Sequence, residues 1–170
     1  QTCALPISDD AISPAPQVSE KEATAALQES KSGYEQKILT LEQTPGAYST
    51  ELADAYYGLG TTLQSLGQHE EALSALGKSL QAIRYSNGLQ DMKQLPVLHT
   101  MLTSSKSLEK WEDVDAQLQL AYYITSRQLA PGEDTRQAAT LALGRWKLEA
   151  AQKELLPPRD RKSTRLTSSH

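Results

Sequence analysis

The spacing of apolar residues along the chain is typical of helices. Between positions 20 and 43, apolar side chains recur three, four or seven residues apart, at Leu27, Tyr34, Ile38 and Leu41. This period places them on one face of a helix. Similar blocks follow at about 49–66, 68–85, 95–108, 110–129 and 134–155. The pattern therefore predicts six amphipathic helices.

Proline and glycine fall between these blocks. Pro45-Gly46, Asn87-Gly88 and Pro131-Gly132 follow the ends of predicted helices, where they stop a helix or supply a left-handed residue. Pro96 lies in the first turn of its block, where proline is tolerated. Ser19 with Glu22 forms a capping-box pattern at the start of the first helix. Short connections between the blocks predict antiparallel neighbouring helices.

Composition supports the same fold class. Positions 9–159 contain 23 Leu but only 7 Val and Ile together. Strands favour β-branched residues, so a sheet is not expected. The prediction is an all-α protein.

One segment is self-similar to the next and carries a recognisable set of positions. The segment from Ala53 to Arg84 contains, in order, an aromatic residue, a Leu-Gly pair, a large apolar residue, a turn glycine, a small residue, a large apolar residue and a small residue. They are Tyr56, Leu59-Gly60, Leu63, Gly67, Ala72, Leu76 and Ser79. Small residues at Gly60 and Ala72 allow two antiparallel helices to cross closely, and Gly67 forms the turn. This segment resembles the tetratricopeptide repeat. The resemblance implies helix-turn-helix units stacked as a right-handed α-solenoid.

A second copy lies 42 residues further along the chain. Its positions are Leu98, Met101, Leu102, Trp111, Val114, Leu118 and Ala121, with Glu109 in place of the turn glycine. A third copy begins near Gln137 and repeats the Leu-Gly pair as Leu143-Gly144. Tyr34 precedes Leu76 by the same interval, so the first helix is expected to be the second half of an earlier repeat. Within a domain 19–158 we predict a half repeat 19–46, repeats 53–94 and 95–136, and a half repeat 137–156.

Two further resemblances concern the repeat family. Repeats with a 42-residue period resemble those of kinesin light chains. A block of local sequences also resembles bacterial tetratricopeptide proteins of largely unassigned role. Its members are Gly67-Gln68-His69-Glu70-Glu71-Ala72, Asn87-Gly88-Leu89, Gln94-Leu95-Pro96, and Trp111 followed by acidic residues. This second resemblance implies a periplasmic or exported setting in preference to a cytoplasmic one.

The two ends of the chain can be encoded by one DNA segment read from its two strands. Gln1 to Ile7 written as CAG ACG TGT GCT CTT CCG ATC has a reverse complement that translates to the residues at Asp160 to Leu166. This relationship resembles a sequencing adapter translated at both ends. We therefore expect 1–8 and 160–170 to be non-native, 9–18 to be a disordered lead-in, and the native part to be a fragment.

Removing both ends changes the charge balance. The two ends contain one acidic and three basic residues. Without them, the acidic residues fall from 21 to 20 and the basic residues from 17 to 14, so the net charge changes from −4 to −6. Cys3, the single cysteine, also leaves. An acidic chain argues against nucleic-acid binding through phosphate neutralisation. No apolar run approaches the ~20 residues of a membrane-spanning helix.

Candidate chemistry is sparse. His69 and His99 stand apart from any metal-ligand spacing, so no metal or cofactor is expected. His69 is interpreted as a solvated turn residue. Four acidic residues near the start of the 110–129 helix are interpreted as favourable to its dipole rather than as a site; they are Glu109, Glu112, Asp113 and Asp115. No Ser or Thr has a partnered base, so no catalytic residue is expected and the chain is not expected to be an enzyme.

The tetratricopeptide resemblance places a concave groove on the first helix of each repeat. Its candidate binding residues are Tyr57, Thr61, Gln64, His99, Thr103, Lys106 and Arg145. The same register also includes Asp54, Gly58, Ser65, Pro96, Thr100, Ser107, Leu141, Leu148 and Glu149. Only Lys106 and Arg145 among them are basic, which disfavours a carboxylate clamp. The leading hypothesis is a non-catalytic scaffold that binds a protein or peptide. The alternatives are a structural protein that self-associates or docks to an envelope complex and, third, an accessory domain of a larger enzyme.

Overall fold

The structure is a computed structural model and describes residues 20–43 and 50–156. It contains α1 (Glu20–Glu42), α2 (Thr50–Ser65), α3 (His69–Asn87), α4 (Gln94–Ser107), α5 (Trp111–Gln128) and α6 (Asp134–Gln152). The described residues contain no strand, and each helix begins and ends within three residues of its predicted limits. The expectations for the chain ends, the lead-in, the Ser19 cap and the Pro45-Gly46 stop lie outside the described residues.

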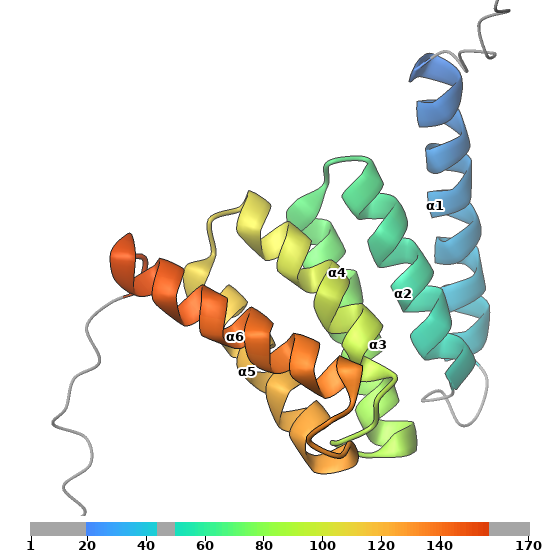
Figure 1. Cartoon of the computed structure of the whole chain (residues 1–170). Coiled ribbons are helices and arrows are strands. Elements are labelled where there is room, and N and C mark those ends of the chain that lie inside the picture. The colour runs from blue at the N-terminus through green and yellow to red at the C-terminus, as the bar shows by residue number, and fades with distance from the viewer. Residues whose placement is uncertain (1–19, 44–49, 157–170) are drawn as a thin grey trace, which may run out of the picture.

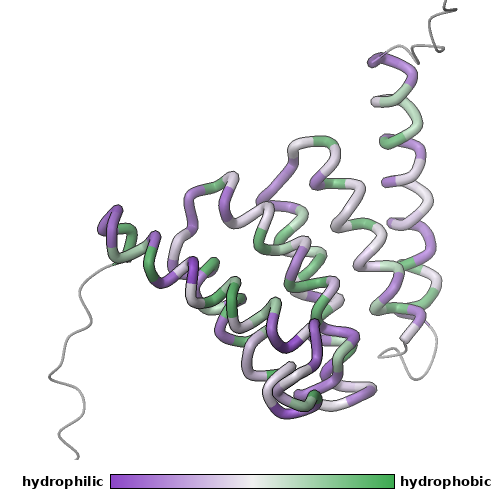
Figure 2. The backbone as a smooth tube through the Cα atoms, viewed as in Figure 1, coloured by the Kyte–Doolittle hydropathy of each residue, from purple (hydrophilic) through white to green (hydrophobic). Residues whose placement is uncertain are grey.

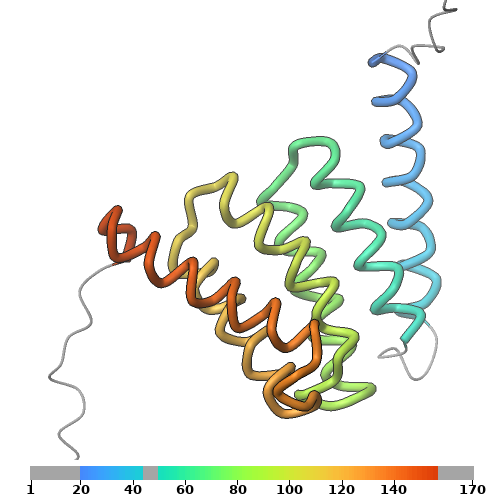
Figure 3. The backbone as a smooth tube through the Cα atoms, in the orientation of Figure 1, coloured from blue at the N-terminus to red at the C-terminus, as the bar shows by residue number. Residues whose placement is uncertain are grey.

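The helices stack in chain order as an α-solenoid. Each helix contacts the next one along the chain, and α2 also contacts α4. Figure 3 shows consecutive helices running in opposite directions, so neighbouring helices are antiparallel. In Figure 1, α6 crosses in front of α5, while α1 stands beside α2. The all-α helical-repeat prediction is therefore confirmed.

The turns that join α2 to α3 and α4 to α5 share one hydrogen-bond pattern. The amide of Gly67 donates to the carbonyl oxygen of Gln64 at 3.0 Å, and the amide of Glu109 donates to that of Lys106 at 3.1 Å. Both turn residues have positive φ, 75° at Gly67 and 54° at Glu109. Glu109 thus replaces the turn glycine in conformation as well as in register, as expected for the second copy.

Close packing at the α2–α3 crossing depends on a missing side chain. A Cβ added to Gly60 would lie 2.6 Å from Cγ of Leu76 and 3.4 Å from the carbonyl oxygen of Ala72. Leu76 and Ala72 are fully buried. The predicted role of Gly60 is confirmed. Gly144 differs, because nothing lies within 4 Å of an added Cβ, so its Leu-Gly pair does not mark a crossing among the described residues.

The core consists of three apolar clusters spaced along the stack. The first joins α1, α2 and α3 around Ile38 and Tyr56, and the second joins α2 to α5 around Leu76 and Leu98. The third joins α4, α5 and α6 around Val114 and Trp146. Figure 2 shows apolar and polar positions interleaved along every helix, as expected when each helix packs on one side only. None of the described helices is apolar enough over sufficient length to cross a bilayer.

Buried polar side chains fix the helices to the connecting loops. Gln94 is fully buried at the start of α4. Its Nε2 donates to the carbonyl oxygen of Leu89 at 2.9 Å, and its Oε1 accepts from Nε of Arg84 at 2.8 Å. The loop before α4, positions 88–93, is therefore held by an internal side chain. Such satisfied buried groups specify one arrangement of the loop.

Candidate binding groove

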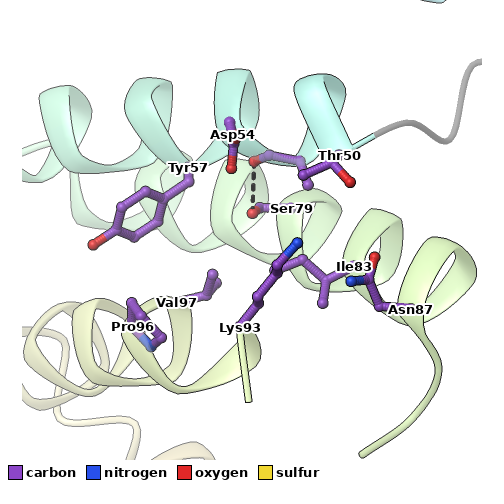
Figure 4. Close-up of a pocket in the computed structure, with 10 residues that line it drawn as sticks. Thr50, Asp54, Tyr57, Ser79, Ile83, Asn87, Lys93, Pro96 and Val97 are labelled. Carbon is purple, nitrogen blue, oxygen red and sulfur yellow. Dashed lines mark hydrogen bonds between the residues drawn. The ribbon is translucent and has the colours of Figure 1, made fainter. Parts of the chain in front are cut away.

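A cavity of about 310 Å³ lies between α2, α3 and α4. Its apolar walls include Ala53, Ile83 and Val97, which are buried. Figure 4 shows ten lining residues from α2, α3, α4 and the loop before α4. The full set is Thr50, Ala53, Asp54, Tyr57, Ser79, Ile83, Asn87, Lys93, Pro96 and Val97. Three predicted groove positions, Asp54, Tyr57 and Pro96, therefore meet at one cavity.

Tyr57 forms the side of this cavity. Its ring is half-buried on α2 and packs against the second core cluster. The hydroxyl of Thr100 on α4 donates to the hydroxyl of Tyr57, with 3.5 Å between the two oxygens. Figure 4 shows the ring on the cavity side of α2, opposite Pro96 and Val97. Tyr57 of α2 thus contacts α4 and presents its aromatic ring to the cavity.

Thr61 and Gln64 are engaged within the scaffold. The Thr61 hydroxyl donates to the carbonyl oxygen of Gly58 at 2.8 Å. Nε2 of Gln64 donates to the carbonyl oxygen of Thr100 and to Oγ of Ser104, each at 2.9 Å. Both side chains are half-buried. The amide of Gln64 therefore joins α2 to α4, which sequence reasoning did not anticipate.

Most groove positions predicted on α4 are open to solvent, whereas Thr100 is buried. His99, Thr103 and Lys106 are all exposed, and their spacing of four and three residues places them on one side of the helix. Of the seven predicted binding residues, these three and Arg145 of α6 offer their side chains to a partner without first releasing a described hydrogen bond. The helix α4 thus supplies a polar, accessible stripe next to the cavity.

Lys106 on α4 interacts electrostatically with a carboxylate on α6. The pKa of the Glu149 carboxyl on α6 lies below its ordinary value, first because Lys153 donates a hydrogen bond to it and attracts it by charge. Lys106 of α4 adds a smaller attraction in the same direction. Arg145 is exposed on α6, one helical turn before Glu149. Charged side chains of α4 and α6 are therefore close enough for Lys106 to attract Glu149.

Asp115 does more than favour the helix dipole, the role that the sequence indicated for the acidic residues at the start of α5. It is buried, and Nε1 of Trp146 donates to its Oδ1 at 2.9 Å while Lys147 forms a short ion pair with the same oxygen. Nε2 of Gln119 donates to Oδ2 at 2.6 Å. Burial raises the pKa of this carboxyl, but the bonds from Lys147 and Trp146 outweigh it, so the net pKa lies below the ordinary value. Asp115 therefore fixes α6 to α5.

His69 also differs from its predicted environment. It is half-buried rather than solvated, and its Nδ1 lies 3.5 Å from Oγ of Ser104 on α4. The turn residue thus contacts the next repeat. Over the described part of the chain, no group of three His, Cys, Asp or Glu side chains is placed to hold a metal ion.

Sequence reasoning missed three polar residues of the cavity. Thr50 lies at the first position of α2, Asn87 at the last position of α3, and Lys93 in the loop before α4. Groove positions of the repeat register lie on first helices, and Thr50, Asn87 and Lys93 stand at none of these positions. The signal was present in the repeat length, since a 42-residue period leaves a longer linker between repeats.

Comparisons with known proteins identify the fold and nothing finer. No protein-family model matches the chain, and no curated protein sequence matches it. A crystal structure of nearly identical TPR-like repeats of a kinesin light chain-like protein from Podosopora anserina is similar, with a TM-score of 0.62 and 17% identity. The alignment covers 80% of this chain and 65% of that one, so the chain spans less than two thirds of its length.

Proposed function

We propose that this helical-repeat chain is a non-catalytic scaffold that binds a peptide or a segment of a partner protein along α2, α4 and α6. The observation that carries the proposal is the cavity between α2, α3 and α4. It combines an apolar floor with an aromatic wall and a polar rim, which is the composition of a ligand pocket. A volume of about 310 Å³ lies at the small end of the range for ligand pockets, so the cavity has room for a side chain of a longer ligand.

The exposed residues next to the cavity extend the proposed surface. His99, Thr103 and Lys106 continue it along α4, and Arg145 continues it onto α6. Interfaces of this kind derive most of their affinity from one or two aromatic anchors and their orientation from the polar rim. Tyr57 is the aromatic group in that position, so we expect it to dominate binding.

Selection of peptides from a random library on the immobilised chain tests the proposal. Affinities of selected peptides are then measured for the wild type, Tyr57→Ala and Arg145→Glu. We expect Tyr57→Ala to weaken binding at least tenfold, which is the range of an interface anchor. Tyr85→Ala is the matched control, because Tyr85 is 75% exposed on α3 and does not line the cavity.

Thermal unfolding of each variant separates lost binding from lost fold. Arg145→Glu changes an exposed side chain and is expected to leave stability within about 0.5 kcal/mol of the wild type. Peptides whose affinity is unchanged by both Tyr57→Ala and Arg145→Glu would place the binding surface elsewhere and refute the proposal.

A structural role in assembly is the second candidate, and one observation favours it. Leu141 and Leu148 on α6 are 58% and 61% exposed, and open space surrounds Gly144 between them. Apolar exposure along one helix face is a common feature of protein contact surfaces. Light scattering across a concentration series tests this role. A monomer at all concentrations would exclude self-association, and a dimer abolished by Leu141→Glu would support it.

A further inference from the structure

The cavity between α2, α3 and α4 carries one unpaired positive group. Lys93 is exposed in the loop before α4, and its ammonium has no hydrogen-bond or ion-pair partner within the described ranges. In Figure 4 its side chain rises from the loop toward α2 and α3. Its backbone amide donates to Oδ1 of Asp91 at 2.7 Å, which fixes the residue at the cavity edge. The backbone of Lys93 is thus held at the cavity edge, and its ammonium forms no ion pair in the described structure.

One unpaired negative group lies at the same cavity. Asp54 is exposed on α2, and Figure 4 shows its carboxylate directed toward the cavity. The ion pairs found among residues 20–43 and 50–156 include neither Asp54 nor Lys93, so these two groups do not neutralise each other. The carboxylate of Asp91 is engaged by Nδ2 of Asn87 at 3.1 Å and by the Lys93 amide. Asp54 is therefore the free acidic group at the rim.

Apolar side chains form the floor of the cavity that both charges line. Ala53, Ile83 and Val97 are buried there, and Pro96 and the Tyr57 ring complete the apolar surface. These walls favour an apolar group, and an aliphatic side chain matches their small and branched residues. A ligand matching all three features has an aliphatic side chain between one acidic and one basic side chain.

We propose that the cavity recognises a peptide segment in which one aliphatic residue is flanked by an acidic residue on one side and a basic residue on the other. The aliphatic side chain occupies the floor, the acidic side chain pairs with Lys93, and the basic side chain pairs with Asp54. Oppositely placed charges fix the direction of a bound segment and select against its reversed form. This inference rests on the proposed function and adds the chemistry of the partner.

Fluorescence anisotropy with two labelled peptides tests the proposal. The peptides carry Glu-Leu-Lys or Lys-Leu-Glu between identical Gly-Ser flanks, so they differ only in the order of charge. We expect the wild type to prefer one order by about tenfold, the scale for exchanging an attraction for a repulsion at two exposed pairs. The double variant Asp54→Lys, Lys93→Glu is expected to invert that preference.

Single variants and a matched control complete the design. Lys93→Glu and Asp54→Lys are each expected to abolish the preference, whereas Lys37→Glu, an exposed lysine on α1, is expected to preserve it. The exchanged positions are exposed, so the fold is expected to survive, and circular dichroism checks this. Raised salt should reduce the preference because exposed charges are screened.

Three results would overturn the inference. They are equal binding of both peptides by the wild type, no inversion in the double variant, and equal binding of a neutral Gln-Leu-Gln peptide. Each leaves the proposed function standing if library-selected peptides still lose affinity with Tyr57→Ala. If Tyr57→Ala leaves affinity unchanged while the charge preference persists, the role of Tyr57 in the proposed groove is refuted instead. The two failures are therefore distinguishable.

Discussion

Gly67 and Glu109 occupy the same turn position 42 residues apart, and both adopt a left-handed backbone, with φ of 75° and 54°. Their amides bond to carbonyl oxygens of Gln64 and Lys106, which are also 42 residues apart. Glycine adopts this conformation at little cost, whereas a residue with a Cβ pays about 1 kcal/mol or more. The second repeat therefore retains the turn without the residue that favours it.

Glu109→Gly is expected to be more stable than Glu109→Ala by about 1 kcal/mol. Both substitutions remove the same carboxylate, so their difference reports the backbone alone. Urea unfolding monitored by circular dichroism measures it. Gly67→Ala should destabilise by a similar amount, and the control Gly77→Ala, in the interior of α3 with open space at its Cβ, should stabilise. Equal stability of Glu109→Gly and Glu109→Ala would show that this turn is not strained.

Gly60→Ala is expected to destabilise the chain by about 1–3 kcal/mol, the range for overpacking a core. The added Cβ would lie 2.6 Å from Cγ of Leu76, which is fully buried and cannot move freely. Gly144→Ala is the matched control, because it changes the other Leu-Gly pair where space is open. That control should be neutral or stabilising. Thermal unfolding of both variants tests the difference, which would vanish if helix propensity alone governed these glycines.

Asp115→Asn is expected to loosen α6 and to cost about 2 kcal/mol, since it weakens the charge-assisted bonds that this buried carboxylate accepts from Trp146 and Lys147. Near-ultraviolet circular dichroism reports the change through the stacked rings of Trp111 and Trp146, whose centroids are 6.0 Å apart. Asp113→Asn, an exposed neighbour on α5, is the control. An unchanged aromatic spectrum in Asp115→Asn would contradict the role of this carboxylate.

The same carboxylate predicts an acid transition. Its pKa is lowered from 3.8 in the folded state, so the unfolded chain binds the proton first. The stabilisation from Asp115 is therefore present above pH 3.8 and is lost as pH falls through the lower folded value. We expect the aromatic signal of the wild type to decline in that range. Asp115→Asn should lack this component, and an identical acid profile in both proteins would refute the prediction.

Ser105→Ala is expected to destabilise by about 1–3 kcal/mol because it leaves a buried donor unpaired. Nε2 of Gln117 donates to Oγ of Ser105 at 2.8 Å, while its Oε1 is buried with no partner in the described structure. Adding Gln117→Met to Ser105→Ala removes both orphaned groups and should recover most of the loss. Urea unfolding of the four members of this cycle measures the coupling. A double variant no more stable than Ser105→Ala would contradict it.

Much of the fold could be predicted because its signals are local. Apolar spacing and the placement of proline and glycine fixed the six helices to within three residues. The 42-residue register identified the turn at Glu109 although its residue type had changed. Helix formation and turn geometry depend on residues within a few positions of each other, and such neighbours are visible in the sequence itself.

The tertiary structure alone decided which polar side chains remain available. Gln64 and Thr61 matched groove positions, yet their hydrogen bonds are made within the scaffold. Asp115 matched an acidic group at a helix start, yet Trp146 and Lys147, 31 and 32 residues away in sequence, contact it in space. Lys93 lines the candidate site from a loop that contains none of the predicted groove positions. Helical period determines the face of a residue, but its partners come from distant helices, and only packing brings those together.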